Sequence, residues 1–400
     1  TATSATCVTG LVLHDTALYW SPFGQLVILL LIQVGGMGVV TIAVAIFMFA
    51  GKRIGLKQRW VMQESISAPQ VGGIVRMTGF ILKTAFLIEG VGVLLLALRF
   101  CPQFGLGRGL WYAVFHSVSA FCNAGFDIFG AIAPGQSLIE FNADPVVLLT
   151  LSALIIIGGL GFLVWENIVQ KRSFGKFSVY ARMVLLMTAA LLAVGWAGTC
   201  LLEWNNPETL GGMTVGEKLL NGFFQSATLR TAGFAAIDQA KLTESGKAFS
   251  CVLMSIGGSS GSTAGGIKTV TFLVLALTIW ARARGKSTVC AFKRTIPDEQ
   301  TQNAMIIAFI VLALAVFGGI FISATSPMSF TDAVYEAVSA LATVGLSAGG
   351  TASLSIPAQI LIIIYMYFGR VGVLTISLGF LAGDRAEERF RYAETNLLIG

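Results

Sequence analysis

Four short segments combine hydroxyl or amide side chains with a glycine, a set of groups suited to binding a partly dehydrated cation. They span residues 6–11, 121–126, 229–234 and 341–346, and in each one the glycine is followed by Leu or Phe. The glycines recur at intervals of about 110 residues, which predicts a chain built from repeats. A ring of backbone carbonyls around an ion must be supplied from several sides, and four copies of one loop supply it.

We expect these loops to hold a transported cation, with no covalently bound cofactor. Glycine adopts the backbone angles that a chain needs when it leaves a helix and aims its carbonyls at an axis. A glycine loop that only joins two helices is the alternative, and four copies of one loop argue against it. The predicted ion-binding (filter) residues are Thr9, Gly10, Asn123, Ala124, Gly125, Thr231, Ala232, Gly233, Thr343, Val344 and Gly345.

The composition is that of a membrane protein, because 55% of the 400 residues are hydrophobic and only 12% are charged. So little polar surface cannot coat a soluble protein of this size. Seven stretches are apolar over about 20 residues, the length that crosses a bilayer. They span residues 22–49, 76–98, 145–166, 181–202, 246–281, 301–323 and 357–382, and the fifth is interrupted near its middle.

Each repeat has the order helix, short amphipathic segment, glycine loop, helix. Segments 110–120, 216–228 and 329–340 are too short to span a bilayer, and as pore helices their C-terminal dipoles would favour a cation. We predict an all-α integral membrane protein with four pseudo-symmetric repeats around one central pore. The predicted repeats are residues 1–50, 51–170, 171–283 and 284–400, the last with a C-terminal tail. Since the sequence starts inside a loop segment, we expect the first helix to be absent from this chain.

Lysine and arginine are concentrated in four segments, 50–76, 170–182, 282–294 and 383–391. Loops rich in these residues stay in the cytoplasm. We therefore expect a multi-pass protein of the cell membrane with cytoplasmic basic loops and C-terminus, and glycine loops that enter from outside. The same distribution explains the net charge of +6 without nucleic acid as a partner.

The sequence has no pattern typical of an enzyme. It contains no Walker lysine in a glycine loop, no HExxH and no nucleophile elbow. The six cysteines have no metal-binding spacing, and His14 and His116 lack neighbouring carboxylates. A membrane-embedded enzyme or a structural assembly subunit is the alternative class, and the chain lacks the catalytic residues or soluble surfaces that these require.

A run of ten small residues interrupts the fifth span. Each of its five glycines costs about 1 kcal/mol relative to alanine in a helix, so the helix should break there. We expect this broken segment to lie beneath the third loop and to act as a gate, and a packing site for small residues is the alternative. The predicted gate residues in this run are Gly257, Gly258, Ser259, Ser260, Gly261, Ser262, Thr263, Ala264, Gly265 and Gly266.

Two cations complete the predicted gate. Lys268 follows the small-residue run, and Arg370 stands where the other repeats have the second glycine of a pair, as in Gly35-Gly36, Gly158-Gly159 and Gly257-Gly258. A charge at mid-membrane costs at least about 2.5 kcal/mol, so both should face the aqueous path. The alternative is that they anchor helix ends by binding carbonyls. Arg230 is expected in an outer vestibule with a carboxylate partner.

These residues also carry a resemblance to a known family. The loops T-G-L, N-A-G-F, R-T-A-G-F and A-T-V-G-L-S, with Gln33-Val34-Gly35-Gly36-Met37-Gly38, resemble the Trk/Ktr/HKT superfamily of potassium transporters, and the KtrB-type membrane subunit in particular. The resemblance covers essentially the whole chain. It implies a potassium-conducting subunit of a bacterial uptake system, usually a homodimer with one pore per subunit, with a cytoplasmic nucleotide-binding regulatory ring of the KtrA or TrkA type. It also implies a gate at the small-residue run and potassium permeation through an all-glycine filter.

We therefore predict passive potassium flux through a single filter that is gated by an intramembrane loop. The alternative is a proton- or sodium-coupled potassium symporter of the Trk type.

Overall fold

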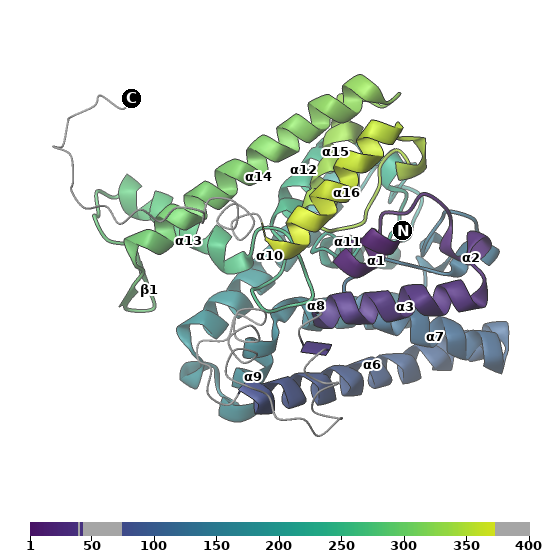
Figure 1. Cartoon of the computed structure of the whole chain (residues 1–400), viewed down its shortest axis with the longest axis horizontal. Coiled ribbons are helices and arrows are strands. Elements are labelled where there is room, and N and C mark those ends of the chain that lie inside the picture. Colours follow the sequence, from purple (N-terminus) through teal and green to yellow (C-terminus); the bar gives the residue numbers. More distant parts are fainter. Residues whose placement is uncertain (39–40, 43–73, 373–400) are drawn as a thin grey trace.

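The computed structural model describes residues 1–38, 41–42 and 74–372. The described residues form mostly helices (Figure 1). The first repeat contains α1 (Ala2–Cys7), α2 (Thr16–Tyr19) and α3 (Pro22–Met37). The second contains α6 (Ile74–Phe104), α7 (Leu106–Phe121), α8 (Pro145–Leu160), α9 (Phe162–Lys171) and the 3-10 turns η1 (Phe129–Ala131) and η2 (Ile139–Phe141).

The third and fourth repeats follow the same order. The third contains η3 (Phe174–Lys176), α10 (Val179–Glu203), α11 (Val215–Thr228), η4 (Gln239–Lys241), α12 (Glu244–Ser255) and α13 (Thr269–Ala283). A small antiparallel hairpin of β1 (Cys290–Ala291) and β2 (Arg294–Thr295) pairs Cys290 with Thr295 and Ala291 with Arg294. The fourth repeat contains α14 (Asp298–Thr325), α15 (Phe330–Leu341), η5 (Thr351–Ser353) and α16 (Ile356–Val371).

Capping residues explain where the helices begin. The helices that follow the glycine loops in the first, second and fourth repeats are α3, α8 and α16. They start with a side-chain cap at Ser21, Asp144 and Ser355, and each has a proline at its first or second position. Proline is favoured there because those N–H groups have no partner inside the helix. The pore helix α11 starts with a capping box of Thr214 and Glu217. Local sequence therefore sets the start of these four helices.

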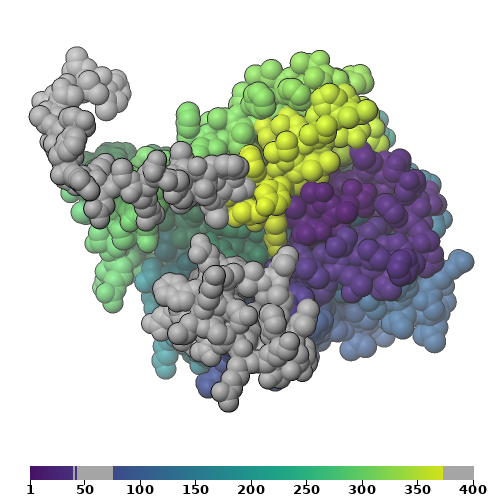
Figure 2. Space-filling model, viewed as in Figure 1, coloured from purple at the N-terminus to yellow at the C-terminus, as the bar shows by residue number. Residues whose placement is uncertain are grey.

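The three short helices predicted before the glycine loops are present as α7, α11 and α15, and α1 is the equivalent in the first repeat. Each packs against the helix that follows the glycine loop of the preceding repeat: α7 on α3, α11 on α8 and α15 on α12. The series closes because α1 packs on α16. Figures 1 and 2 show this closure, with the purple N-terminal repeat lying against the yellow α16. The four repeats thus form a ring in chain order.

Within the described residues, three helices are long and apolar enough to cross a membrane, Val75–Phe104, Val179–Glu203 and Asp298–Thr325. The pair α8 and α9 adds a fourth if it counts as one span, although it is bent by 95°. The apolar helices α3, α13 and α16 are shorter. Their exposed Leu, Ile and Phe side chains are those of a protein that is solvated by lipid rather than water.

Unbroken helices were predicted at 22–49, 145–166 and 357–382, and the structure interrupts all three. The breaks fall at Gly38, Gly161 and Gly372, whose φ angles are 85°, 91° and 97°. A right-handed helix does not continue through a residue with positive φ, so each helix ends there. Only the interruption of the fifth span was foreseen, and it separates α12 from α13. Residues 43–49 and 373–382, the basic segment 383–391, the boundary at residue 50 and the C-terminal tail lie outside the described residues.

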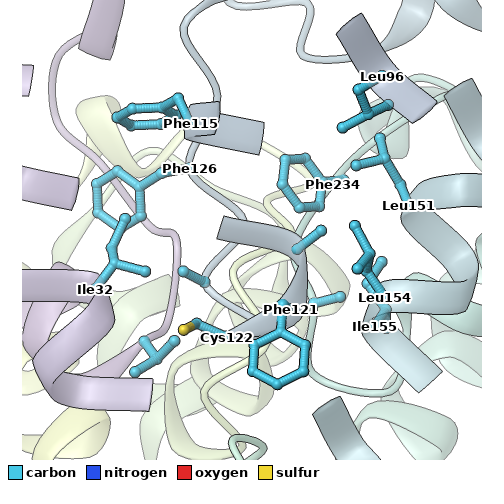
Figure 3. Close-up of a cluster of buried hydrophobic side chains, with 14 of the residues drawn as sticks. Ile32, Leu96, Phe115, Phe121, Cys122, Phe126, Leu151, Leu154, Ile155 and Phe234 are labelled. Carbon is cyan, nitrogen blue, oxygen red and sulfur yellow. The ribbon is translucent and has the colours of Figure 1, made fainter. Parts of the chain in front are cut away.

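The residue after each filter glycine anchors its loop in the core. Phe126 and Phe234 follow Gly125 and Gly233, and both belong to one buried cluster (Figure 3). Leu11 and Leu346 occupy the same position in the other repeats and are also buried. A buried Phe or Leu side chain contributes about 1.5–3 kcal/mol. This burial explains why an apolar residue recurs after the glycine.

Candidate functional site

The four loop glycines meet in a closed ring. A Cβ atom added at Gly10 would lie 2.7 Å from the carbonyl oxygen of Ala124, and one at Gly125 would lie 2.6 Å from that of Ala232. One at Gly233 would lie 2.6 Å from the oxygen of Val344, and one at Gly345 would collide with that of Thr9. Each glycine therefore faces the carbonyl that precedes the next glycine, and the fourth faces the first. No side chain fits in this ring.

Backbone angles repeat in all four loops. The residue two positions before each glycine has positive φ, at Val8 (58°), Asn123 (57°), Thr231 (64°) and Thr343 (52°). The glycines also have positive φ, between 67° and 103°, and the residue between the two does not. Left-handed angles cost energy in residues with a side chain, so the surrounding packing must hold them. Four loops thus share one uncommon conformation.

The position of the left-handed residue, two before each glycine, corrects one detail of the predicted filter. Val8, and not Thr9, is the structural equivalent of Asn123, Thr231 and Thr343, while Thr9 matches Ala124, Ala232 and Val344. Val8 was missed because its side chain is apolar. Counting back two residues from each glycine would have found it, since the conformation belongs to the backbone.

Three of the predicted hydroxyl groups have no partner. The Oγ1 atoms of Thr9, Thr231 and Thr343 are buried and make no hydrogen bond within the described residues. Asn123 differs, since its Nδ2 donates to the carbonyl of Arg230 at 3.2 Å. Its Oδ1 accepts from Thr263 Oγ1 at 3.2 Å. The filter of the second repeat is therefore joined both to the third filter loop and to the small-residue run.

The first glycine of each recurring pair lets a helix approach a pore helix. A Cβ at Gly35 would collide with the carbonyl of Thr6, one at Gly158 with that of Phe121, and one at Gly369 with that of Leu341. Each of these carbonyls lies four residues before a filter glycine. In the third repeat Gly257 instead faces the carbonyl of Gly265 within its own loop. The small-residue run thus changes the contact that the other three repeats share.

The small-residue run, residues 257–266, forms an irregular loop between α12 and α13. Ser259 N donates to the carbonyl of Gly159 at 3.1 Å, and Tyr180 Oη donates to that of Ser260 at 2.9 Å. On the filter side the loop reaches Asn123 through Thr263, and Gly265 lies against Thr343 Oγ1. Broken backbone at this depth is tolerated because protein surrounds it. The loop lies directly against two of the four filter segments.

Arg370 and Lys268 both donate to carbonyls of this part of the protein. Arg370 Nη1 donates to Thr263, and Nη2 donates to Gly35 and, at 3.3 Å, to Gly36. Lys268 Nζ donates to the carbonyl of Ala264 at 2.8 Å. No carboxylate pairs with either cation among the residues that the structure describes. Arg370 thus links the end of α3 to the small-residue run.

Arg230 differs from its prediction. The guanidinium is buried and donates to the carbonyl of Thr188 at 3.3 Å, inside α10. No carboxylate partner lies within ion-pair distance in the described chain, so the predicted ion pair is wrong. The prediction considered only charged side chains as partners, whereas Arg230 binds a peptide carbonyl of α10.

A cavity of about 570 Å³ opens above the ring, and all four filter glycines line it. We call it the mouth cavity. Four carboxylates line it, and the basic groups are His14 and Lys241. The carboxylates are Asp15, Asp127, Glu208 and Asp238. Acidic groups in a concave site raise the local cation concentration.

Asp127 should make the attraction of the mouth cavity for cations depend on pH. Burial, with the nearby Asp15 as a smaller contribution, raises the pKa of Asp127 to about 6, against the N–H group that Phe129 donates. The carboxylate is therefore negative above about pH 6 and neutral below it. At a limiting cation concentration, cation entry through this cavity should fall about twofold when the pH on this side drops from about 7 to about 5. Initial uptake rates measure this, and Asp127→Asn should remove the step while leaving the rate at the lower value.

The described residues contain no group of three or more His, Cys, Asp or Glu side chains that could hold a metal ion. His14 stacks on Tyr19 with ring centroids 4.3 Å apart, and His116 stacks on Phe129 at 4.0 Å. All six cysteines are free. The two histidine rings therefore pack against aromatic side chains.

Comparison with known proteins agrees with this architecture. Residues 1–388 match the family described as TrkH, cation transport protein. The chain is 38% identical to the potassium/sodium uptake protein NtpJ of Enterococcus hirae, over all of this chain and 88% of that protein. It is 37% identical to the Ktr system potassium uptake protein B of Bacillus subtilis, over 98% of this chain and 86% of that protein.

A solved structure shares the fold. The potassium transporter TrkH from Vibrio parahaemolyticus superposes with a TM-score of 0.70 over 94% of this chain and 76% of that one, at 19% identity. The all-α membrane fold expected from the sequence is confirmed. The chain therefore belongs to the TrkH family within the Trk/Ktr superfamily, and it is a membrane transport protein rather than an enzyme.

Proposed function

We propose that the protein conducts K⁺ passively through one filter formed by the four glycine loops. The closed ring of contacts from Gly10 to Ala124 and around to Gly345 and Thr9 supports this proposal most directly. Backbone carbonyls can replace the hydration shell of an ion only if they surround it. The ring has one glycine per loop, so few carbonyl layers are stacked, and discrimination against Na⁺ should be modest. The relatives' names fit this expectation, because one includes sodium and another potassium alone.

Charge distribution supports a sidedness. The basic residues between α13 and α14 lie with the β1–β2 hairpin at the opposite end of the molecule from α2, whose neighbour Asp15 lines the mouth cavity (Figure 1). Since basic loops stay in the cytoplasm, the mouth cavity faces outward in this proposal. A cytoplasmic regulatory subunit and a homodimer complete it. The word "system" in the name of the Bacillus subtilis relative supports a multi-component assembly.

Flux measurements on the purified protein in liposomes test the proposal. A K⁺ gradient alone should drive uptake, with no requirement for Na⁺ or a proton gradient. Uptake that needs either gradient would replace passive flux with the coupled symport of the alternative. Absence of K⁺ flux from well-inserted protein, in the presence of any monovalent gradient, would remove the proposal altogether.

The gate role of residues 257–266 predicts a gain of flux on deletion. Removing residues 259–264 takes away the contacts to Asn123 and Gly159 that hold the loop against the filter. We expect passive K⁺ flux to rise severalfold and to depend less on any cytoplasmic partner. Tyr180→Phe removes one hydrogen bond of about 1 kcal/mol and should raise flux in the same direction by less. Lower flux in an inserted deletion variant would favour a purely structural loop.

A further inference from the structure

Three pore helices carry a polar, fully buried side chain at one shared position. In each helix an aromatic residue precedes it and a hydroxyl residue follows three positions later. The shared position holds His116 in α7, Gln225 in α11 and Glu336 in α15. The flanking residues are Phe115 and Ser119, Phe224 and Thr228, and Tyr335 and Ser339.

Two of these side chains hold the chain that leaves the filter. His116 Nδ1 lies 2.7 Å from the carbonyl of Tyr112, so it carries the proton, and Nε2 accepts from the N–H of Ile128 at 3.5 Å. Gln225 and Gln239 exchange hydrogen bonds of 2.7 and 3.1 Å. Ile128 and Gln239 lie three and six residues after their filter glycines. The shared position thus fixes the segment after the filter.

Glu336 does the same with a carboxylate. It accepts from Ser347 Oγ and, at 3.2 Å, from Thr351 Oγ1. Ser347 and Thr351 lie two and six residues after Gly345, and all three line the mouth cavity. Ser347 Oγ in turn accepts from the N–H of Gly350 at 3.0 Å. No Lys or Arg lies within ion-pair distance of Glu336 in the described part of the chain.

The contact of Glu336 with Ser347 and Thr351 is stronger than the corresponding contacts of His116 and Gln225. Burial raises the pKa of Glu336 to about 7, against the hydrogen bonds from Ser347 and Thr351. In the ionised form these hydrogen bonds are shorter and stronger than neutral ones. A buried carboxylate that loses its donors has no water to replace them, so the loop cannot leave Glu336 without a large cost. The fourth filter segment is therefore held more firmly than the other two. It also closes the ring, through the contact of Gly345 with Thr9.

We propose that Glu336 is a positioning residue that sets the preference for K⁺ over Na⁺ by holding the fourth filter loop through Ser347 and Thr351. This inference rests on the proposed conduction function. A filter that holds its carbonyls at a fixed spacing discriminates between ions of different size, and a loosened loop adapts to the smaller one. Loss of the contact should therefore change ion preference more than the maximal rate.

The test measures K⁺ uptake against K⁺ concentration, with and without Na⁺ as competitor, normalised to protein in the membrane. In Glu336→Ala, Na⁺ should compete at a roughly three- to tenfold lower concentration, with little change in maximal rate. Glu336→Gln keeps the shape and one acceptor oxygen but loses the carboxylate, so its effect should be smaller than that of Glu336→Ala. The double variant Ser347→Ala/Thr351→Ala should match Glu336→Ala, and combining all three changes should add little, because the residues act through one contact.

The matched control is Glu140→Gln, which removes an exposed carboxylate that does not line the mouth cavity. It should leave ion preference unchanged. If Glu336→Ala inserts normally and competes with Na⁺ as the parent does, the inference is wrong while the conduction proposal stands, since the parent transports in the same assay. If Ser347→Ala/Thr351→Ala keeps the parent's ion preference while Glu336→Ala does not, the carboxylate does not act through the loop, and the inference again fails.

Discussion

Replacing Arg370 with alanine is expected to raise K⁺ influx at saturating K⁺ by roughly three- to tenfold, because a barrier lower by 1.4 kcal/mol corresponds to a tenfold rate. The guanidinium has no carboxylate partner in the described chain, and in a low-dielectric passage its repulsion of a passing cation is barely screened. The same change frees Thr263 from the end of α3. Ion preference should change little. Initial uptake rate against external K⁺, normalised to membrane protein, measures the effect.

Two variants separate charge from tethering. Arg370→Lys keeps the charge and cannot reach all three carbonyls, so it should transport close to the parent rate if repulsion is the barrier. Arg284→Ala removes an arginine that stacks on Trp280 at 4.2 Å, away from the loop, and should have no effect. An inserted Arg370→Ala variant that transports no faster than the parent would assign Arg370 to anchoring alone.

Substituting a filter glycine is expected to lower K⁺ uptake strongly and to let Na⁺ compete better. In Gly125→Ser the new Cβ would lie 2.6 Å from the carbonyl of Ala232, so a loop of the ring must move. Gly10→Ser should act in the same way through Ala124. We expect uptake to fall by about tenfold or more, since displacing one carbonyl of the ring removes an ion ligand. Uptake in a transport-deficient host, with and without Na⁺, measures both effects.

Gly135→Ser is the matched control for Gly125→Ser. Both glycines line the mouth cavity and have nearly equal φ, 70° and 67°, so a side chain strains the backbone equally. A Cβ at Gly135 meets nothing within 4 Å. The control should therefore lose stability at most and keep its ion preference. Equal K⁺ and Na⁺ behaviour in the two variants would contradict the assignment of the ring as the filter.

Several features were predictable because they follow from composition and local preference. Long apolar stretches identify a membrane protein, and the recurrence of Gly10, Gly125, Gly233 and Gly345 identifies the repeat. The pore helices were found from their short amphipathic segments. The break at residues 257–266 was found because so many glycines cannot sustain a helix.

Other features were not predictable because they depend on residues far apart in the chain. The glycines at 38, 161 and 372 stand in apolar stretches that read as continuous, and the structure gives them positive φ where α3, α8 and α16 end. The partner of Arg230 was sought among carboxylates and is the carbonyl of Thr188. A backbone carbonyl is present at every residue, so no sequence pattern marks the one that is used.

The amino-acid sequence by itself determined the membrane class, the fourfold repeat and the position of each filter glycine, since hydropathy, period and the absence of a side chain are properties of single residues and their spacing. The tertiary structure alone decided the order of the ring, the contact of Arg370 with Gly35 across 335 residues, and the hold of Glu336 on the fourth loop. These depend on which backbone groups the packed helices bring together, and side-chain type does not encode that choice.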